Sequence, residues 1–282
     1  MTAATVWING ERADSLSALD RGLHYGDGLF ETVACVNGRP RLLSLHLARL
    51  ALGCARLRLP APGPQRLRAG IEQAAAQADR SIVKLLVTRG VAVGRGYAAG
   101  AEQGSWLVIR YPWPEEDAAL ARSGVRVRTA ATRLGENPAL AGLKHLNRLE
   151  QVLARNEDSV IEAEEALMLS HSGRLICGTM SNVFLVDEAG GRRRLRTPDL
   201  ALCGVAGVMR SVVLREAVHE GIPASECALI PADLDSAAEV FLTNVRIGIW
   251  PVRSVDGRPL APGPLTRGLQ ERLAPLLEGA DA

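Results

Sequence analysis

Residues 29–57 read LFETVACVNGRPRLLSLHLARLALGCARL, and two kinds of secondary structure follow one another in this stretch. Leu29–Val36 is rich in apolar and β-branched residues and predicts a strand. Asn37-Gly38 predicts a tight turn, because both residues accept a positive φ at low cost, and 40–45 is expected to return as a second strand. From Leu43 to Leu57 the leucines recur at helical spacing. A hairpin that leads directly into a helix favours an α+β architecture.

The same two patterns continue along the chain. Strands outnumber helices and come largely as hairpins rather than in strict βαβ alternation, which again favours α+β. The short basic run Arg192–Arg194 is expected in a solvated loop. Further strands are predicted at 6–8, 82–88, 105–110, 125–129, 166–170, 182–186, 240–243 and 247–252, and further helices at 67–77, 147–163, 207–220 and 265–277.

One segment is typical of a connection between domains. Residues 111–117 read YPWPEED, in which two prolines stiffen the chain and the acidic residues suit a helix start. We therefore expect a smaller N-terminal α/β domain at 1–111, a linker at 112–123 and a larger C-terminal domain at 124–282.

Composition excludes several classes of protein. The 282 residues include 33 Lys+Arg and 31 Asp+Glu, a net charge of +2, which does not suit electrostatic binding of nucleic acid. No apolar run approaches the roughly 20 residues of a membrane-spanning helix, and the N-terminus lacks a secretory pattern. Five cysteines at irregular spacing argue against a disulfide framework. These features predict a protein of the reducing cytoplasm.

Other common chemistries lack their motifs. The five histidines never fall at metal-ligand spacing, and neither His-Glu-x-x-His nor Gly-x-Ser-x-Gly occurs. Gly94–Tyr97 lacks the third glycine of a dinucleotide loop, so a flexible turn is the better interpretation. We therefore expect no metal site.

Lysine is the informative residue type. The chain has only two, Lys84 and Lys144, against 31 arginines, so a retained lysine is a candidate for chemistry that arginine cannot perform, such as nucleophilic attack by a neutral amine. The strand context of Lys84 favours a solvated or edge position. Lys144 stands between apolar residues just before a predicted helix, where desolvation could lower its pKa.

Two further features suit an anion. Arg49 lies on the predicted helix and is either a phosphate ligand or an arginine that only packs its stem. Gly204–Arg210 enters a helix, whose first N–H groups bind anions well, although an ordinary glycine loop explains it equally. An amine, a phosphate-binding arginine and a helix start would together suit pyridoxal phosphate.

Several segments resemble the fold-type IV pyridoxal-phosphate enzymes, in the right order and over nearly the whole chain. Within that family the Lys144 segment is most similar to the aminodeoxychorismate lyases. The matching segments are Asp20–Thr32, His46–Leu50, Asn137–Leu153, Gly178–Phe184 and Cys203–Arg210, together with Thr88–Gly90 and Gly94–Tyr97.

The resemblance implies a two-domain fold with mixed β-sheets and a β-barrel-like C-terminal domain, a cofactor between the domains, and a homodimer. It implies that Lys144 binds pyridoxal 5'-phosphate as a Schiff base and moves the proton. It further implies that Arg49, the backbone N–H groups of Val208 and Met209, and Asn244 bind the cofactor phosphate.

One position departs from the family. Cys177 stands where the family usually has a glutamate paired with the pyridine nitrogen. A carboxylate keeps that nitrogen protonated, which a neutral thiol cannot do fully, whereas a thiolate could if its pKa were lowered. The departure weakens the case for aminotransferase chemistry in particular.

The implied reaction converts 4-amino-4-deoxychorismate to 4-aminobenzoate and pyruvate, a step of folate synthesis. The small-molecule substrate has two carboxylates, so cationic and hydroxyl groups are expected near it; the candidates are Arg95, Tyr97, His24 and Tyr25. Two alternatives stay open: an aminotransferase for D- or branched-chain amino acids, and a cofactor-binding protein with little catalysis.

Overall fold

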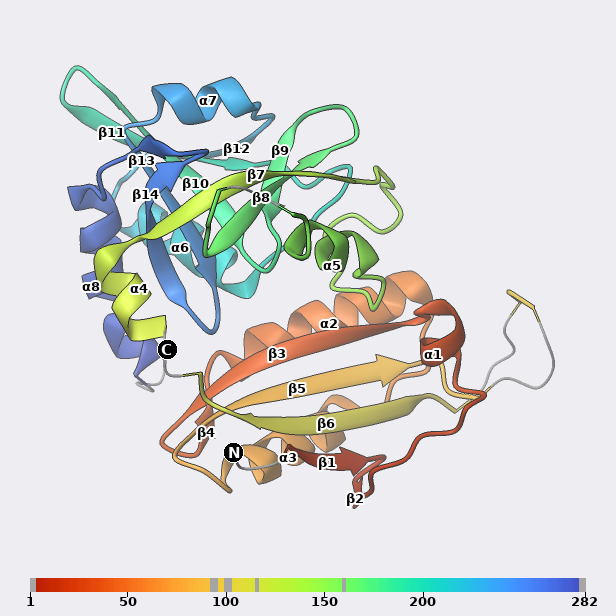
Figure 1. The fold of residues 1–282 in the computed structure, drawn as a ribbon. Coiled ribbons are helices and arrows are strands. Elements are labelled where there is room, and N and C mark those ends of the chain that lie inside the picture. Colours follow the sequence, from red (N-terminus) through yellow and green to blue (C-terminus); the bar gives the residue numbers. More distant parts are fainter. Residues whose placement is uncertain (1–3, 92–95, 99–102, 115–116, 159–160, 279–282) are drawn as a thin grey trace. The chain divides into compact units, whose positions relative to one another are not determined.

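The computed structural model describes residues 4–91, 96–98, 103–114, 117–158 and 161–278 (Figure 1). The chain forms two compact units. The first comprises Met1–Pro114, Leu143–Asn147 and Pro275–Ala282, and the second comprises Glu115–Gly142 and Arg148–Ala274. The Lys144 segment is thus part of the first unit, although it lies within the sequence range predicted for the C-terminal domain.

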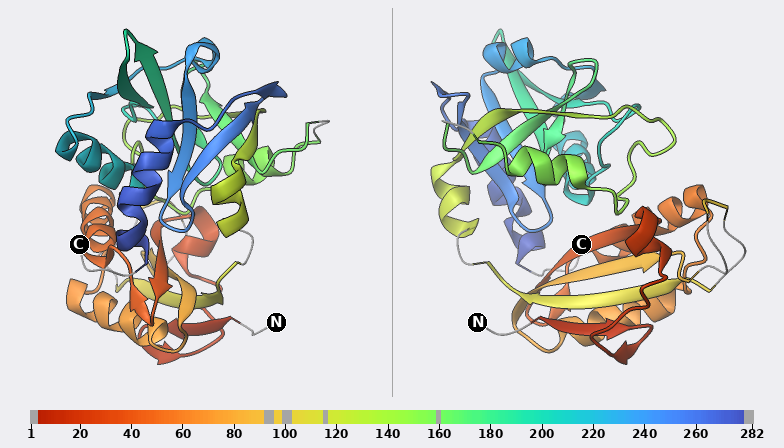
Figure 2. Two further views of the ribbon diagram at one scale, coloured as in Figure 1. Left: turned by 90° about the vertical axis from the view of Figure 1, so that its left-hand side faces the viewer. Right: turned by 45° about the vertical axis from the view of Figure 1, so that its right-hand side comes forward.

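The first unit is built on a six-stranded antiparallel sheet of order β2-β1-β6-β5-β3-β4. Its strands are β1 (Thr5–Ile8), β2 (Glu11–Arg12), β3 (Gly28–Val36), β4 (Arg39–Pro40), β5 (Arg80–Thr88) and β6 (Ser105–Pro112), and its helices are α1 (Arg21–Tyr25), α2 (Leu43–Leu57) and α3 (Pro64–Ala75). Helices α2 and α3 pack against β3, β5 and β6, and Figure 2 shows both on one side of the sheet.

The hairpin turns follow the sequence expectation. Asn9 and Asn37 have φ values of 53° and 52°, which place both in the left-handed region. The returning strand predicted at 40–45 is wrong, because β4 ends at Pro40 and α2 begins at Leu43. Leu42, with a φ of 53°, turns the chain out of the extended conformation between them.

The second unit is built on a nine-stranded mixed sheet. Its strands follow the order β12-β11-β10-β13-β14-β7-β8-β9, with β15 beside β14, and the pairs β7–β8, β7–β14 and β11–β12 are parallel. The sheet curls, since β9 at one end of this order also contacts β10 and β11. The predicted α+β class with mixed sheets and a barrel-like second domain is confirmed.

The elements of this second part of the chain are short and numerous. The strands are β7 (Val125–Leu134), β8 (Glu165–Ser170), β9 (Leu175–Gly178), β10 (Asn182–Ala189), β11 (Arg192–Pro198), β12 (Ala224–Cys227), β13 (Glu239–Asn244), β14 (Gly248–Val255) and β15 (Arg258–Pro259). The helices are α4 (Asp117–Ser123), α5 (Leu149–Arg155), α6 (Val208–His219), α7 (Pro231–Ser236) and α8 (Pro264–Leu277). Helix α4 occupies most of the segment predicted as a linker. Among the described helices, none is both long and apolar enough to cross a membrane.

Two sequence expectations fail here for identifiable reasons. The helix predicted at 147–163 is only α5, because the Glu157 carboxylate accepts hydrogen bonds from the backbone N–H groups of Ala131 and Thr132 and pairs with Arg128, which draws the chain toward β7. The Arg192–Arg194 run is not a loop. It lies in β11, where Arg193 and Arg194 pair with Glu188 and Asp187 of the neighbouring strand β10.

Candidate active site

The position of Lys144 is fixed by backbone pairing with the beginning of β3. The Phe30 N–H donates to the Lys144 carbonyl oxygen at 2.9 Å, and the Leu146 N–H donates to the Gly28 carbonyl oxygen at 3.0 Å. Leu29 and His145 form an antiparallel bridge between these two bonds. The Lys144 Nζ lies 4.2 Å from the centroid of the Phe30 ring. The regular strand β3 thus holds the backbone of Lys144 in place.

Lys84 contacts the same aromatic ring. Its Nζ lies 5.0 Å from the Phe30 ring centroid, and it is paired with Thr32 across the β3–β5 ladder. The side chain is half-buried, and this burial lowers the pKa of Lys84. The expected edge position is therefore wrong, because β5 lies between β3 and β6, and the side chain is half-buried beside Phe30. The alternation of residues along β5 predicts on which face of the strand Lys84 lies, but only the fold shows that Phe30 lies over that face.

On the helix-covered face of the sheet, Glu31 binds two side chains of α2. Its Oε1 accepts a hydrogen bond from Arg49 Nε at 2.8 Å, its Oε2 accepts one from Arg49 Nη2, and His46 Nδ1 lies 2.6 Å from Oε2. Glu31 and His46 are 1% and 0% exposed. Burial alone would raise the pKa of Glu31, but the hydrogen bond from His46 and the charge of Arg49 outweigh it and lower this pKa to about 2. Arg49 is therefore held by an ionised carboxylate.

His46 completes this network. Burial lowers its pKa more than Glu31 raises it, so the neutral ring donates Nδ1–H to Glu31 near neutral pH. Its Nε2 has no hydrogen-bond partner among the described residues. The sequence pattern indicates that this pair is buried. Glu31 lies on the same face of β3 as buried Val33, and His46 lies on the same face of α2 as buried Leu50.

Three of the four candidate substrate residues lie together around α1. The rings of Tyr25 and Tyr97 are 5.5 Å apart, and those of His24 and Tyr25 are 5.8 Å apart. Arg21 organises the group: its Cζ lies 4.8 Å from the Tyr25 ring, and its Nη2 donates to the Tyr97 carbonyl oxygen. Arg95 lies outside the described residues.

In the second unit, Val208 and Met209 open α6. Gly207 is the N-cap of this helix, and no side chain of the described residues caps it. The first N–H groups of a helix have no partner within it, so this end can bind an anion. A Cβ at Gly207 would meet Asn182 Oδ1 at 2.0 Å, which explains why glycine is needed there. Asn182 Nδ2 in turn donates to the Val205 carbonyl oxygen and fixes the loop.

Asn244 ends β13 and is engaged in a turn. Its Nδ2 donates to the Met180 carbonyl oxygen, and its Oδ1 accepts from the backbone N–H groups of Arg246 and Ile247. The buried carboxylate of Glu165 holds the neighbouring segment by accepting hydrogen bonds from the Met180 N–H and other groups of 179–181. Asn244 thus shapes the local backbone, and at most one of its amide hydrogens remains to contact a ligand.

Cys177 lies on β9 in an apolar cluster that includes Cys203. Burial and the neighbouring Cys203 and Glu165 raise the pKa of Cys177 to about 12, and the opposing charge of Arg148 does not compensate. The side chain is therefore a neutral thiol near pH 7, and the thiolate considered from the sequence is disfavoured by its surroundings.

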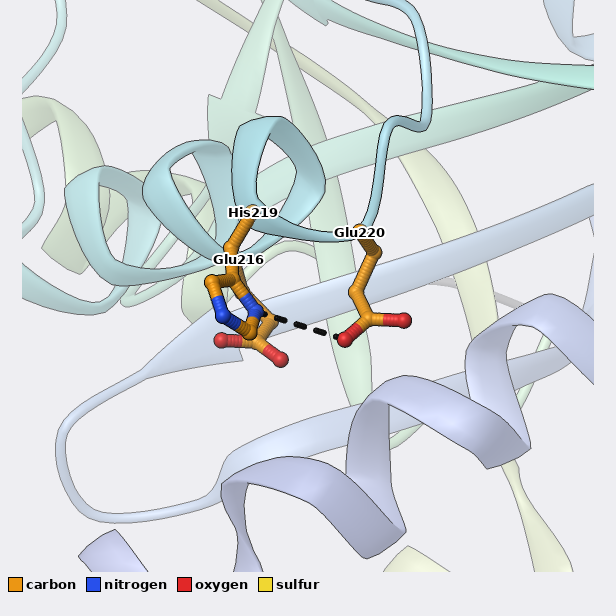
Figure 3. Close-up of side chains that lie close together, drawn as sticks. All are labelled: Glu216, His219 and Glu220. Carbon is orange, nitrogen blue, oxygen red and sulfur yellow. Dashed lines mark ion pairs between the residues drawn. The ribbon is translucent and has the colours of Figure 1, made fainter.

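One group of side chains has metal-ligand chemistry. Glu216, His219 and Glu220 at the end of α6 hold their ligand atoms within 4.8 Å of one another (Figure 3). Glu220 already pairs with His219 at 3.3 Å and with Arg272 at 2.5 Å, and His219 is largely exposed. The arrangement is a surface network at a helix C-terminus, in which Glu220 is already bound by His219 and Arg272.

The residues present fit a cofactor that carries an aldehyde and a phosphate. Lys144 and Arg49 of the first unit have the chemistry to hold an aldehyde and a phosphate, and the start of α6 in the second unit has backbone N–H donors of the kind that bind phosphate. Gly207 leaves room for the Asn182 side chain beside the start of α6, where a Cβ would clash with Asn182 Oδ1. The amine and the arginine belong to the first unit, and the helix start and Cys177 belong to the second.

Comparison with known proteins identifies the family. The amino-transferase class IV family matches residues 28–255, and the chain belongs to this family. The chain is 33% identical to aminodeoxychorismate lyase of Vibrio harveyi, over 95% of this chain and 98% of that protein. It is 45% identical to 4-amino-4-deoxychorismate lyase from Pseudomonas aeruginosa. The two structures superpose with a TM-score of 0.91 over 97% of this chain and 100% of the Pseudomonas chain. A D-alanine aminotransferase of Listeria monocytogenes is 29% identical over 93% and 91% of the two chains.

The network around Glu31 gives a prediction for stability. Because the folded pKa of about 2 lies below the ordinary 4.5, the ionised carboxylate stabilises the fold above pH 4.5, and this contribution disappears as the pH falls toward 2. Glu31→Gln is therefore expected to lower the free energy of unfolding by about 3 kcal/mol at pH 7. Urea unfolding of the wild type and of Glu31→Gln at several pH values from 7 to 3 measures this difference in the free energy of unfolding.

The matched control is Glu72→Gln, which removes an exposed ion pair with Arg68 and should change stability by less than about 1 kcal/mol. The difference between wild type and Glu31→Gln should shrink as the pH falls. A difference independent of pH would show that Glu31 stabilises by shape and not by charge.

Proposed function

We propose that this protein is a pyridoxal-phosphate-dependent lyase that converts 4-amino-4-deoxychorismate to 4-aminobenzoate and pyruvate. The observation that carries the proposal is the arrangement on β3, where Lys144 is paired to the strand and the amines of Lys144 and Lys84 both contact the Phe30 ring. It supplies an amine that can bind the cofactor and a cation suited to a carboxylated substrate. The two lyase relatives, similar over nearly the full chain, support the same reaction.

Lys144 Nζ would hold the cofactor through its aldehyde, and Arg49 and the N–H groups of Val208 and Met209 would hold its phosphate. Glu31 would orient Arg49 for this task by holding its Nε and Nη2 edge. Asn244 would contribute mainly by shaping the nearby turn. When bound, pyridoxal phosphate withdraws electrons from the amine-bearing carbon of the substrate.

In this proposal Lys144 moves the proton. With its amine free, Lys144 Nζ would remove the hydrogen from the amine-bearing ring carbon of the substrate. The bond to the enolpyruvyl oxygen breaks as the ring becomes aromatic, and the protonated Lys144 returns its proton as pyruvate forms. Phe30 covers the amine on one side and limits its exposure to water.

The substrate's carboxylates need cations. We propose Lys84 for one of them, because its pKa is lowered by burial and a bound carboxylate would compensate that cost. His24, Tyr25, Tyr97 and Arg95 remain candidates for the other, and the first three lie together around Arg21.

Lys144→Ala is expected to abolish both cofactor attachment and product formation. The absorbance of the purified protein between 330 and 430 nm (roughly the region in which bound pyridoxal phosphate absorbs) reports attachment, and 4-aminobenzoate fluorescence reports turnover after addition of enzymatically made substrate. Removing a nucleophile on which every step depends costs on the order of 10⁴-fold or more in rate. A variant that retained turnover would exclude Lys144 as the catalytic base.

Lys84→Met should raise KM about tenfold or more while leaving cofactor absorbance unchanged, since the lost ion pair is worth roughly 1.5–3 kcal/mol. Lys84→Arg, which keeps the charge, should recover part of this loss. Steady-state kinetics on both variants test the assignment. An unchanged KM in Lys84→Met would assign the substrate carboxylates to other groups.

Cys177→Glu tests the departure from the family at the pyridine nitrogen. Aromatisation of the substrate ring supplies driving force of its own, so a weak electron sink suffices and lyase turnover is expected to change by less than about tenfold, or 1.4 kcal/mol. Single-turnover rates of both proteins measure this. A gain of several orders of magnitude would show that the neutral thiol limits the reaction.

An aminotransferase is the second candidate, favoured by the D-alanine aminotransferase relatives. It predicts that D-alanine or a branched-chain amino acid alone converts the cofactor to its amine form, with a matching loss of absorbance near 410 nm (roughly the position of the aldehyde form). The lyase proposal predicts little such conversion. The neutral Cys177 thiol stabilises a protonated pyridine nitrogen less than a carboxylate would, and transamination depends on that proton.

We also propose that the enzyme works as a homodimer in the cytoplasm. All five cysteines are free thiols, which suits a reducing compartment. The family resemblance supports the dimer, and sedimentation of the cofactor-loaded protein tests it.

A further inference from the structure

Two arginines and a tryptophan meet at the end of the first unit's sheet that is remote from Lys144. Arg41 follows β4, Arg80 begins β5 and Trp113 follows β6. The guanidinium carbon of Arg80 lies 4.4 Å from the centroid of the Trp113 ring, and that of Arg41 lies 5.3 Å from it. One indole ring therefore holds two cations.

The Arg41 side chain is buried without the partners that a buried cation normally has. The residue is 8% exposed, and its Nε has no hydrogen-bond partner in the described part of the chain. Burial and the charge of Arg80 lower the pKa of Arg41 to about 10. Burying a cation beside another cation is costly, and cation–π contacts return only part of that cost.

Among the described residues, the acidic groups near Arg41 leave its charge largely uncompensated. Glu278 favours the charged form of Arg41, but the two form no ion pair within the described residues. Cys35 also faces Arg41, and burial raises the pKa of this thiol to about 12, so it carries no charge near pH 7. Within the part of the chain that the structure describes, the corner thus holds two guanidinium groups and one carboxylate at longer range.

We propose that Arg41 and Arg80 bind a small oxyanion, a carboxylate or phosphate group, with Trp113 as the platform that orients both guanidinium groups. Guanidinium groups bind both oxyanions through paired N–H donors, and an anion here would receive the unpaired Nε–H of Arg41. The anion would offset the repulsion between the two arginines.

This site is separate from the proposed active site. Phe30, beside Lys144, and Val36, paired with Arg80, stand six residues apart on β3, a separation of about 20 Å along the strand. The bound anion is therefore a second ligand and not the substrate, and the inference does not depend on the lyase proposal.

The test is a calorimetric titration of the cofactor-loaded protein with inorganic phosphate and, separately, with benzoate. Loading the cofactor first occupies the phosphate-binding groups around Arg49. The variants are Arg80→Gln, which changes an exposed side chain and leaves the core intact, and Arg41→Met, which keeps the apolar stem. Arg39→Gln is the matched control, because Arg39 is exposed one residue before Pro40 and has no contact with Trp113 in the described structure.

Wild type and Arg39→Gln are expected to bind one anion per chain with a Kd of about 1 mM or lower, and both site variants should weaken binding at least tenfold, about 1.4 kcal/mol. The relative affinity of phosphate and benzoate identifies which oxyanion the site prefers. Binding that is equal in all four proteins, or that is lost in Arg49→Met and not in Arg80→Gln, would overturn the proposal, as would the absence of saturable binding in wild type.

Discussion

The pairing of residues 143–147 with the beginning of β3 is the constraint on which the candidate active site depends. Two backbone hydrogen bonds hold Lys144 on a strand whose own position is fixed by β5. Backbone pairing is insensitive to side-chain identity, so the amine keeps its place while the side chains around it vary. Phe30, the residue that donates one of these bonds, also provides the ring that both lysines contact.

A second constraint lies on the opposite face of the same strand. Glu31, next to Phe30, is buried and ionised because His46 and Arg49 both bind it. Successive strand residues point to opposite faces, so one dipeptide serves the amine on one side and the proposed phosphate ligand on the other. A buried charge without partners would be costly, and this network satisfies it while orienting Arg49.

Cys177 shows how burial narrows the possible chemistry. A thiol in this apolar cluster stays protonated near neutral pH, so it cannot act as the strong electrostatic partner that a carboxylate would be. A reaction that gains aromaticity tolerates this weakness better than transamination does. The lyase proposal is therefore consistent with a neutral thiol at this position.

The sequence by itself determined the local elements and the candidates: hairpin turns at Asn9 and Asn37, helix periodicity, and Lys144 as one of only two lysines. These follow from short-range propensity, spacing and composition. The sequence could not determine that Lys84 and Lys144 contact the same Phe30 ring. It also could not determine that the hydrogen bonds of Glu157 end helix α5 early. Those outcomes depend on residues far apart in the chain, because burial and partner charges arise only when strands pair and helices cover them.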